Sequence, residues 1–132
     1  MRSHEEKTTI RFADADPAGI VFYPRAIALA HGVVENLIRH SSIGWHAWFA
    51  SPDHAAPLRH AAADFLLPMR AGETFTARAA VEKIGDTSVS FLVAFVNAAG
   101  ETAARIRTVH VMIDKATGKP VRLTEEIRSA LA

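Results

Sequence analysis

The residues best suited to chemistry lie close together near the amino terminus, between Asp14 and Pro24. Asp14 and Asp16 precede a turn-forming Pro-Ala-Gly segment and an apolar run that leads into a predicted helix. A helix N-terminus stabilises developing negative charge, because it has unpaired N–H groups and the positive end of the helix dipole. The Asp16 carboxylate could attack a carbonyl or activate a water, while a backbone N–H near Tyr23 stabilises the oxyanion. The segment therefore suits acyl transfer, unless both aspartates make only Asx turns and a helix cap.

A second pair of chemically capable residues, His31 and Glu35, is four residues apart and so adjacent on the surface of the predicted helix. His31 shares the apolar stripe of Ile27, Val34 and Ile38, the helix face expected to meet the sheet or a pocket. Two interpretations stay open: a buried core histidine bonded to Glu35, or a polar group that binds substrate.

Several other catalytic chemistries lack the residues that they need. The chain has no cysteine, which excludes disulfides, thiolate zinc sites and cysteine nucleophiles. No Gly-x-Ser-x-Gly elbow supports a serine hydrolase. Four further histidines lack an Asp or Glu partner at metal-ligand spacing, so we expect no metal site and no cofactor; they are His46, His54, His60 and His110.

The 132 residues are about the modal size of one domain, and no repeat or linker divides them. We therefore predict a single domain, residues 1–132, with an ordinary hydrophobic core. Fifteen Lys and Arg against fourteen Asp and Glu give a net charge of +1, so no basic field marks a nucleic-acid or membrane-surface binder. The first residues are polar where a signal peptide needs an apolar core, and no stretch is apolar enough for a membrane span. This predicts a cytoplasmic location.

Hydrophobic periodicity predicts the elements that must position these residues. Apolar residues at helical spacing predict one long early helix of roughly 16 residues, which begins at Pro24 and ends near His40. Alternation and turn signals predict strands before and after it, at residues 8–12, 58–69, 74–84, 88–97 and 102–114, and a short terminal helix from Thr124. A helix inserted early into an antiparallel meander covers one face of the sheet, so the predicted fold class is α+β.

The run from Asp14 to Pro24 also resembles the signature of a known family. It consists of Asp-Ala-Asp-Pro-Ala-Gly-Ile-Val-Phe-Tyr-Pro and is similar to the motif of the 4-hydroxybenzoyl-CoA thioesterase family of hotdog-fold proteins. Residues 68–73, 84–91 and 111–114 resemble that family's later strands in order and spacing. The resemblance implies a hotdog fold, in which a curved antiparallel sheet of five to six strands wraps a long central helix. It also implies homodimers or homotetramers with active sites at the dimer interface.

The activity implied by this resemblance is that of an acyl-CoA thioesterase, which hydrolyses a thioester to a free acid and coenzyme A. Asp16 matches the family's catalytic carboxylate, and Tyr23 matches the residue whose backbone N–H polarises the thioester carbonyl. Gly19 matches the position where the backbone comes close to the substrate, which suits a residue without a side chain. Asp14 also matches, and we expect it to hold the loop.

The resemblance extends to residues that would contact the two halves of the substrate. His31 and Glu35 match helix positions of members that act on 1,4-dihydroxy-2-naphthoyl-CoA, whereas the hydroxybenzoyl enzymes tend to have an acid near His31. Because a polar group there could bind a phenolic hydroxyl, we expect an aromatic or hydroxyaromatic acyl group. Ser88 and Arg107 match positions near the nucleotide and phosphates of coenzyme A, although a solvated sheet surface is the alternative for the arginine.

Two other functions stay open on this fold. A dehydratase or hydratase of acyl thioesters would use His31 with Glu35 as a base over the α-carbon. A non-catalytic module would bind acyl-CoA without turnover. Release of a free thiol separates the thioesterase from both alternatives.

Overall fold

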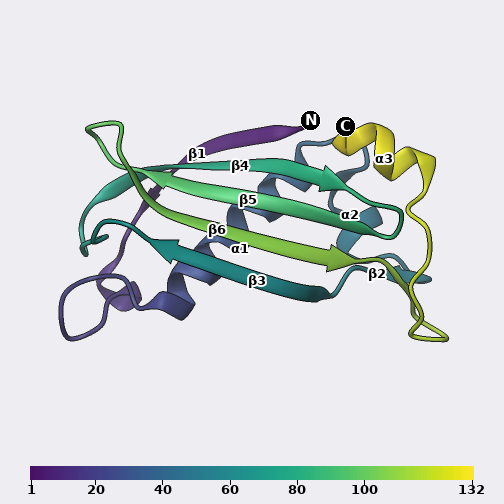
Figure 1. Ribbon diagram of the computed structural model, residues 1–132, viewed down its shortest axis with the longest axis horizontal. Helices are drawn as coiled ribbons and strands as arrows, with labels where there is room; N and C mark the ends of the chain where they lie inside the picture. Colours follow the sequence, from purple (N-terminus) through teal and green to yellow (C-terminus); the bar gives the residue numbers. More distant parts are fainter.

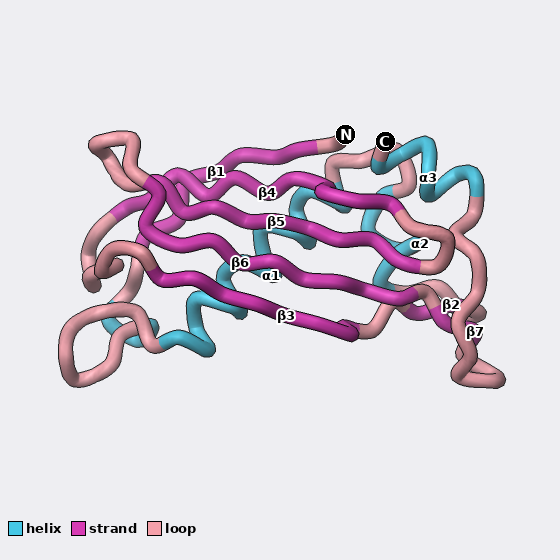
Figure 2. Tube along the Cα trace, viewed as in Figure 1, coloured by secondary structure: helices cyan, strands magenta, loops and turns pink.

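The computed structural model describes all 132 residues. A five-stranded antiparallel sheet, in the order β1-β4-β5-β6-β3, lies against the long helix α1 (Figures 1 and 2). The helices are α1 (Tyr23–Arg39), α2 (Gly44–Phe49) and α3 (Glu125–Leu131). The strands are β1 (Ser3–Thr9), β2 (His54–Ala55), β3 (Leu58–Phe65), β4 (Thr74–Ile84), β5 (Ser88–Val96), β6 (Thr102–Val111) and β7 (Ile113–Asp114), of which β2 and β7 form a separate pair. This arrangement confirms the predicted α+β class, and none of the helices is long and apolar enough to cross a membrane.

Helix α1 packs its apolar face on β1, β4 and β5. Pro24 lies in its first turn, where a missing N–H costs no helical hydrogen bond. The buried face consists of Ala26, Ala30, Val33, Val34, Leu37 and Ile38. His31 lies at the margin of this face and is exposed, so the interpretation of His31 as a buried core histidine is wrong. The buried face differs from the predicted apolar stripe because alanines, which contribute little to a hydrophobic pattern, form the centre of the contact.

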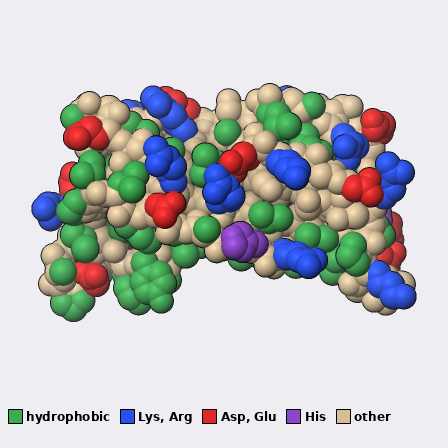
Figure 3. Space-filling view, in the orientation of Figure 1, with side chains coloured by type: hydrophobic (Ala, Val, Ile, Leu, Met, Phe, Trp, Pro, Cys, Tyr) green, Lys and Arg blue, Asp and Glu red, His purple; other side chains and the backbone are tan.

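The central strands follow the alternation that their sequences predict. β4 has the limits expected from the sequence, and its odd-numbered residues from Phe75 to Val81 point into the core. Phe75, Phe91 and Phe95 are the largest of the fully buried side chains. The outer face of the sheet carries Lys and Arg side chains interspersed with Asp and Glu (Figure 3), in agreement with the small net charge.

Three predicted strands have the wrong limits. The strand predicted at residues 102–114 is divided, because β6 ends at Val111 and Ile113–Asp114 form β7, which pairs with β2. The first strand is Ser3–Thr9 and not residues 8–12, because its polar side chains give no apolar alternation and its pairing with β4 defines it. The strand predicted at residues 58–69 ends at Phe65. There the N–H groups of Leu66 and Leu67 both donate to the carbonyl of Ala103, at 2.8 and 3.1 Å, which turns the chain out of the ladder.

β3 forms an open edge of the sheet. It bonds only to β6, and nearly all of its residues are exposed. Its unpaired side is visible along the lower margin of the sheet in Figure 1. An open edge presents free N–H and C=O groups to another chain.

Candidate active site

The loop between β1 and α1 is held in place by Asp14, whose side chain is 3% exposed. One carboxylate oxygen accepts the backbone N–H of Arg11 at 2.9 Å, and the other accepts Nε and Nη2 of Arg25 at 3.0 and 2.8 Å. The Arg11 hydrogen bond, followed by the Arg25 guanidinium, holds the pKa of the Asp14 carboxyl below its ordinary value, although burial opposes this. Both oxygens of Asp14 are therefore occupied in fixing the loop.

Asp16 has one carboxylate oxygen that the protein leaves unused. Oδ1 accepts the N–H of Ala18 at 2.9 Å, an Asx-turn contact, whereas Oδ2 accepts no hydrogen bond. The loop closes through the N–H of Gly19, which donates to the Asp16 carbonyl at 2.9 Å. Gly19 has a φ of +77°, which side chains other than that of glycine rarely adopt, so the turn itself requires a glycine.

The start of α1 exposes a single unpaired backbone N–H. Arg25 and Ala26 both donate to the carbonyl of Phe22, at 2.8 and 3.3 Å, and Pro24 has no N–H. Tyr23, the first helical residue, has no helical carbonyl before it, and its N–H donates to no protein acceptor. The Tyr23 N–H is thus the one available donor at the positive end of the helix dipole.

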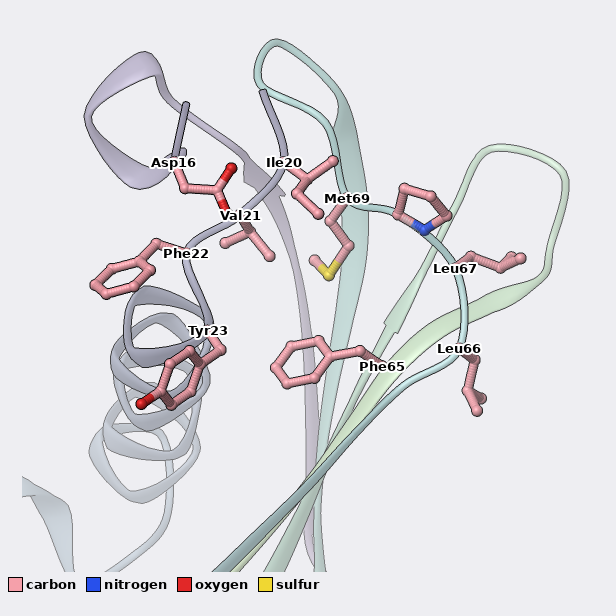
Figure 4. A pocket seen from close by; sticks show the side chains of 10 residues that line it. Asp16, Ile20, Val21, Phe22, Tyr23, Phe65, Leu66, Leu67 and Met69 are labelled. Atoms are coloured by element: carbon pink, nitrogen blue, oxygen red, sulfur yellow. The ribbon is translucent and has the colours of Figure 1, made fainter. Parts of the chain in front are cut away.

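Asp16 and Tyr23 line the same pocket, which has a volume of about 500 Å³. Figure 4 shows Asp16 at its mouth, Tyr23 at the start of the helix, and Phe65 pointing across the pocket from the end of β3. Eight of its ten lining residues are hydrophobic; the ten are Asp16, Ile20, Val21, Phe22, Tyr23, Phe65, Leu66, Leu67, Pro68 and Met69. One apolar cavity is therefore lined by a residue with a free carboxylate oxygen and a residue with a free backbone N–H.

Sequence reasoning missed the opposite wall of this pocket, residues 65–69. The signal was present in Phe65-Leu66-Leu67, a continuous apolar run where a half-exposed edge strand should alternate. Phe65 and Leu66 are 44% and 51% exposed, so they form a large apolar surface at the pocket mouth.

The other helical candidates, His31 and Glu35, do not bond to each other. Glu35 pairs with Arg39 at 3.5 Å, one turn further along α1. The His31 ring lies edge-on to Phe49 of α2, with the ring centroids 6.1 Å apart, and 6.2 Å from the ring of His110 on β6. Neither residue lines the pocket of Asp16 in the same chain.

Ser88 and Arg107 also lie away from that pocket. Ser88 opposes Val111 at one end of β6, whereas Phe65 opposes Ala104 at the other end. Arg107 donates two hydrogen bonds to Glu82 from Nε and Nη2, at 2.7 and 2.8 Å. Within a single chain, the structure therefore does not bring the two predicted coenzyme A contacts to Asp16.

Similarity to known proteins decides the family. Residues 10–131 match the family model of the thioesterase-like superfamily. The chain belongs to that superfamily. A 1,4-dihydroxy-2-naphthoyl-CoA hydrolase of Nostoc punctiforme is 33% identical to this thioesterase over 119 residues, which cover 90% of this chain and 80% of that protein. The same hydrolase of Trichodesmium erythraeum is 30% identical over 121 residues, covering 90% and 88%.

The fold agrees with this assignment. The crystal structure of a 1,4-dihydroxy-2-naphthoyl-CoA thioesterase from Synechocystis superposes with a TM-score of 0.88, covering 98% of this chain and 95% of that one at 22% identity. The hotdog fold expected from the sequence motif is confirmed. The protein is an acyl-CoA thioesterase, and the prediction of a thioester hydrolase is confirmed.

Proposed function

We propose that this thioesterase hydrolyses a hydroxylated aromatic acyl-CoA of the 1,4-dihydroxy-2-naphthoyl class. The observation that carries the proposal is that Asp16, with its free Oδ2, and Tyr23, with its unpaired N–H, line the same apolar pocket. The relatives that cover nearly the whole chain support this acyl group, because they carry it in their names. An apolar cavity of about 500 Å³ is large enough for an aromatic ring.

In this proposal the thioester carbonyl oxygen accepts the Tyr23 N–H, and the helix dipole stabilises the negative charge that develops on it. Asp16 either attacks the carbonyl carbon or removes a proton from the water that attacks it. The carbon–sulfur bond then breaks, and the thiolate of coenzyme A takes a proton: in the direct route from solvent water, and in the general-base route from Asp16, which removed it from the attacking water. In the direct route one water then hydrolyses the acyl–Asp16 anhydride and restores the carboxylate, so both routes give the same acid.

We further propose that two copies pair through β3. The sheet edge is open, and large apolar side chains stand at both of its ends: Leu58 is 53% exposed and Phe65 is 44% exposed. Directly opposed residues of an antiparallel pair share a face of the sheet. A twofold axis through Ala62 pairs residues that share a face of the sheet. It places His60 opposite Asp64 of the partner subunit, and these two side chains have opposite charges when the histidine is protonated. Such a homodimer, alone or as half of a homotetramer, puts the active sites at the interface.

The dimer also accounts for the predicted residues that lie far from Asp16. Antiparallel pairing of β3 brings the Ser88 end of one sheet towards the pocket end of the other. Ser88 would then contact the coenzyme A of the neighbouring site, and His31 would approach its acyl group. Arg107 opposes Ala62 on the axis itself, so the pairing brings it no nearer to either pocket. The dehydratase alternative gains no support, because Glu35 is engaged by Arg39 and does not orient His31 as a base.

The decisive experiment measures thiol release from benzoyl, hydroxybenzoyl, dihydroxynaphthoyl and fatty acyl-CoAs. We expect the highest kcat/KM with dihydroxynaphthoyl-CoA and an Asp16→Asn variant that folds, by circular dichroism, but does not turn over. Asp53→Asn, at an exposed aspartate away from the pocket, is the matched control and should retain full activity. Turnover near the wild-type rate in Asp16→Asn would refute the assignment of the catalytic residue.

A further inference from the structure

One buried histidine holds a hydrogen-bond acceptor that the protein leaves unused. His110 is 6% exposed, and its Nδ1 lies 3.0 Å from the carbonyl oxygen of Ala56. Because a carbonyl oxygen can only accept, Nδ1 carries the proton of the neutral ring, and Nε2 presents a bare lone pair. Burial is the main reason that the pKa of His110 lies below its ordinary value, which keeps the ring neutral. Nε2 is buried and has no partner.

Two other buried side-chain atoms lack hydrogen-bond partners. One is a donor and not an acceptor, and the other lies elsewhere along the sheet. Trp45 Nε1 on α2 is a donor and cannot select for a hydroxyl proton. Thr108 Oγ1 lies on the same face of β6 as His110, but opposite Ala61 near the middle of β3. Only Nε2 combines a pure acceptor with a position at the end of the strand.

His110 cannot serve the pocket of its own chain. It opposes Leu58 at one end of β3, whereas Phe65, at the other end, lines the pocket. Seven residues of extended strand separate these two ends by roughly 23 Å. A group so far from Asp16 does not reach an acyl chain bound there.

The β3-to-β3 pairing, on which this inference rests together with the proposed substrate class, removes that separation. The twofold axis at Ala62 reverses the second β3, so that Phe65 of the partner subunit opposes Arg59, the residue next to Leu58. His110 is one strand further in, at two strand spacings, or roughly 10 Å, from the partner's Phe65. A bicyclic aromatic group that enters between them from the partner's pocket extends towards the face of His110.

We propose that His110 determines the specificity of the thioesterase, because its Nε2 accepts a hydrogen bond from a phenolic hydroxyl of the acyl group bound in the partner subunit's pocket. The ring of His31, at the exposed margin of α1, lies 6.2 Å from that of His110. An acyl group without the hydroxyl leaves the buried acceptor unpaired. A site with a buried hydrogen-bonding group discriminates strongly against a substrate that lacks the matching group.

The test compares two substrates with the same ring system, 1,4-dihydroxy-2-naphthoyl-CoA and 2-naphthoyl-CoA, in the full-length dimer. His110→Phe keeps the aromatic contact with Phe91 but removes the acceptor. We expect kcat/KM for the dihydroxy substrate to fall roughly 10- to 100-fold, while the value for 2-naphthoyl-CoA stays within about threefold. His110→Gln, which restores an acceptor oxygen, should recover part of the preference.

Thr108→Val is the matched control, since it removes the other unpartnered polar atom of β6 but lies opposite the middle of β3 and not at its end. It should leave the ratio of the two kcat/KM values unchanged. Equal losses on both substrates in His110→Phe would give His110 a structural role and overturn the inference. The inference would also be overturned if the wild-type enzyme did not prefer the hydroxylated ring. This measurement can be made even if every His110 variant fails to fold. That last result leaves the proposed hydrolysis intact, whereas a wild type inactive on all aromatic acyl-CoAs refutes both.

Discussion

Arg25 in the first turn of α1 donates two hydrogen bonds to a single oxygen of Asp14, at 3.0 and 2.8 Å. The contact joins the helix, whose free N–H belongs to Tyr23, to the loop that carries Asp16. The ion pair of Arg25 with Asp14 thus fixes the position of Asp16 relative to Tyr23. In the proposed mechanism Asp14 itself contacts neither the thioester carbonyl nor the attacking water. The stability of this link is measurable apart from activity.

Asp14→Asn should destabilise the protein. The amide has only one acceptor oxygen, so either the Arg11 N–H or the Arg25 guanidinium loses its partner. We expect the free energy of unfolding to fall by about 1–3 kcal/mol, measured by urea titration. Asp53→Asn, which changes an exposed aspartate, should cost almost nothing. An Asp14→Asn protein as stable as the wild type would show that the loop is held by its other contacts.

The stability of the wild type should depend on pH through the same carboxyl. Its pKa is lower in the folded state than in the unfolded chain, so its contribution is complete above the unfolded value, about 4. The contribution is lost as the pH falls through the folded pKa, because protonation then breaks the contacts with Arg11 and Arg25. Urea titrations between pH 6 and pH 3 should give a shallower decline for Asp14→Asn than for the wild type; parallel curves would exclude this carboxyl as a source.

Tyr23→Pro should remove the oxyanion donor without removing the helix. Proline is favoured in the first turn of a helix, and Phe22 before it already has the extended conformation (φ −71°, ψ 125°) that a following proline requires. Loss of one oxyanion-hole donor lowers kcat by roughly 100- to 1,000-fold. Tyr23→Ala, which retains the backbone N–H, serves as the control for loss of the ring and should keep kcat close to wild type. If the two variants were equally active, the N–H would have no part in catalysis.

Ala62→Lys should dissociate the proposed dimer. Ala62 is exposed in a single chain, so the change does not disturb the core, but it places two like charges opposite each other at the twofold axis. Analytical ultracentrifugation should show a monomer, and thiol release should fall with it because each site needs both copies. Ala98→Lys, in the exposed turn after β5, should remain dimeric and active. A stable, active dimer of Ala62→Lys would place the interface elsewhere.

Local sequence patterns predicted much of the fold because each is stabilised by contacts close in sequence. The long helix was predicted from its apolar period, and β4 from its alternation, with limits that match at Thr74 and Ile84. β1 was misplaced because its polar residues are ordered by pairing with a strand some seventy residues later, such as Thr9 with Thr74. No local pattern encodes a partner at that distance.

The same division holds for the site. The segment from Asp14 to Pro24 by itself determined the turn and the helix start, and it predicted the residues that would attack and polarise a carbonyl, since all are neighbours along the chain. Tertiary structure alone decided that residues 65–69 close the pocket, that Glu35 pairs with Arg39, and that His110 is buried with one nitrogen unused. These depend on strand register and on which face each strand presents, and a shift of one residue would reverse that face. The candidate catalytic residues could therefore be predicted from one short segment, whereas the pocket wall and the proposed specificity residue depend on contacts between distant segments.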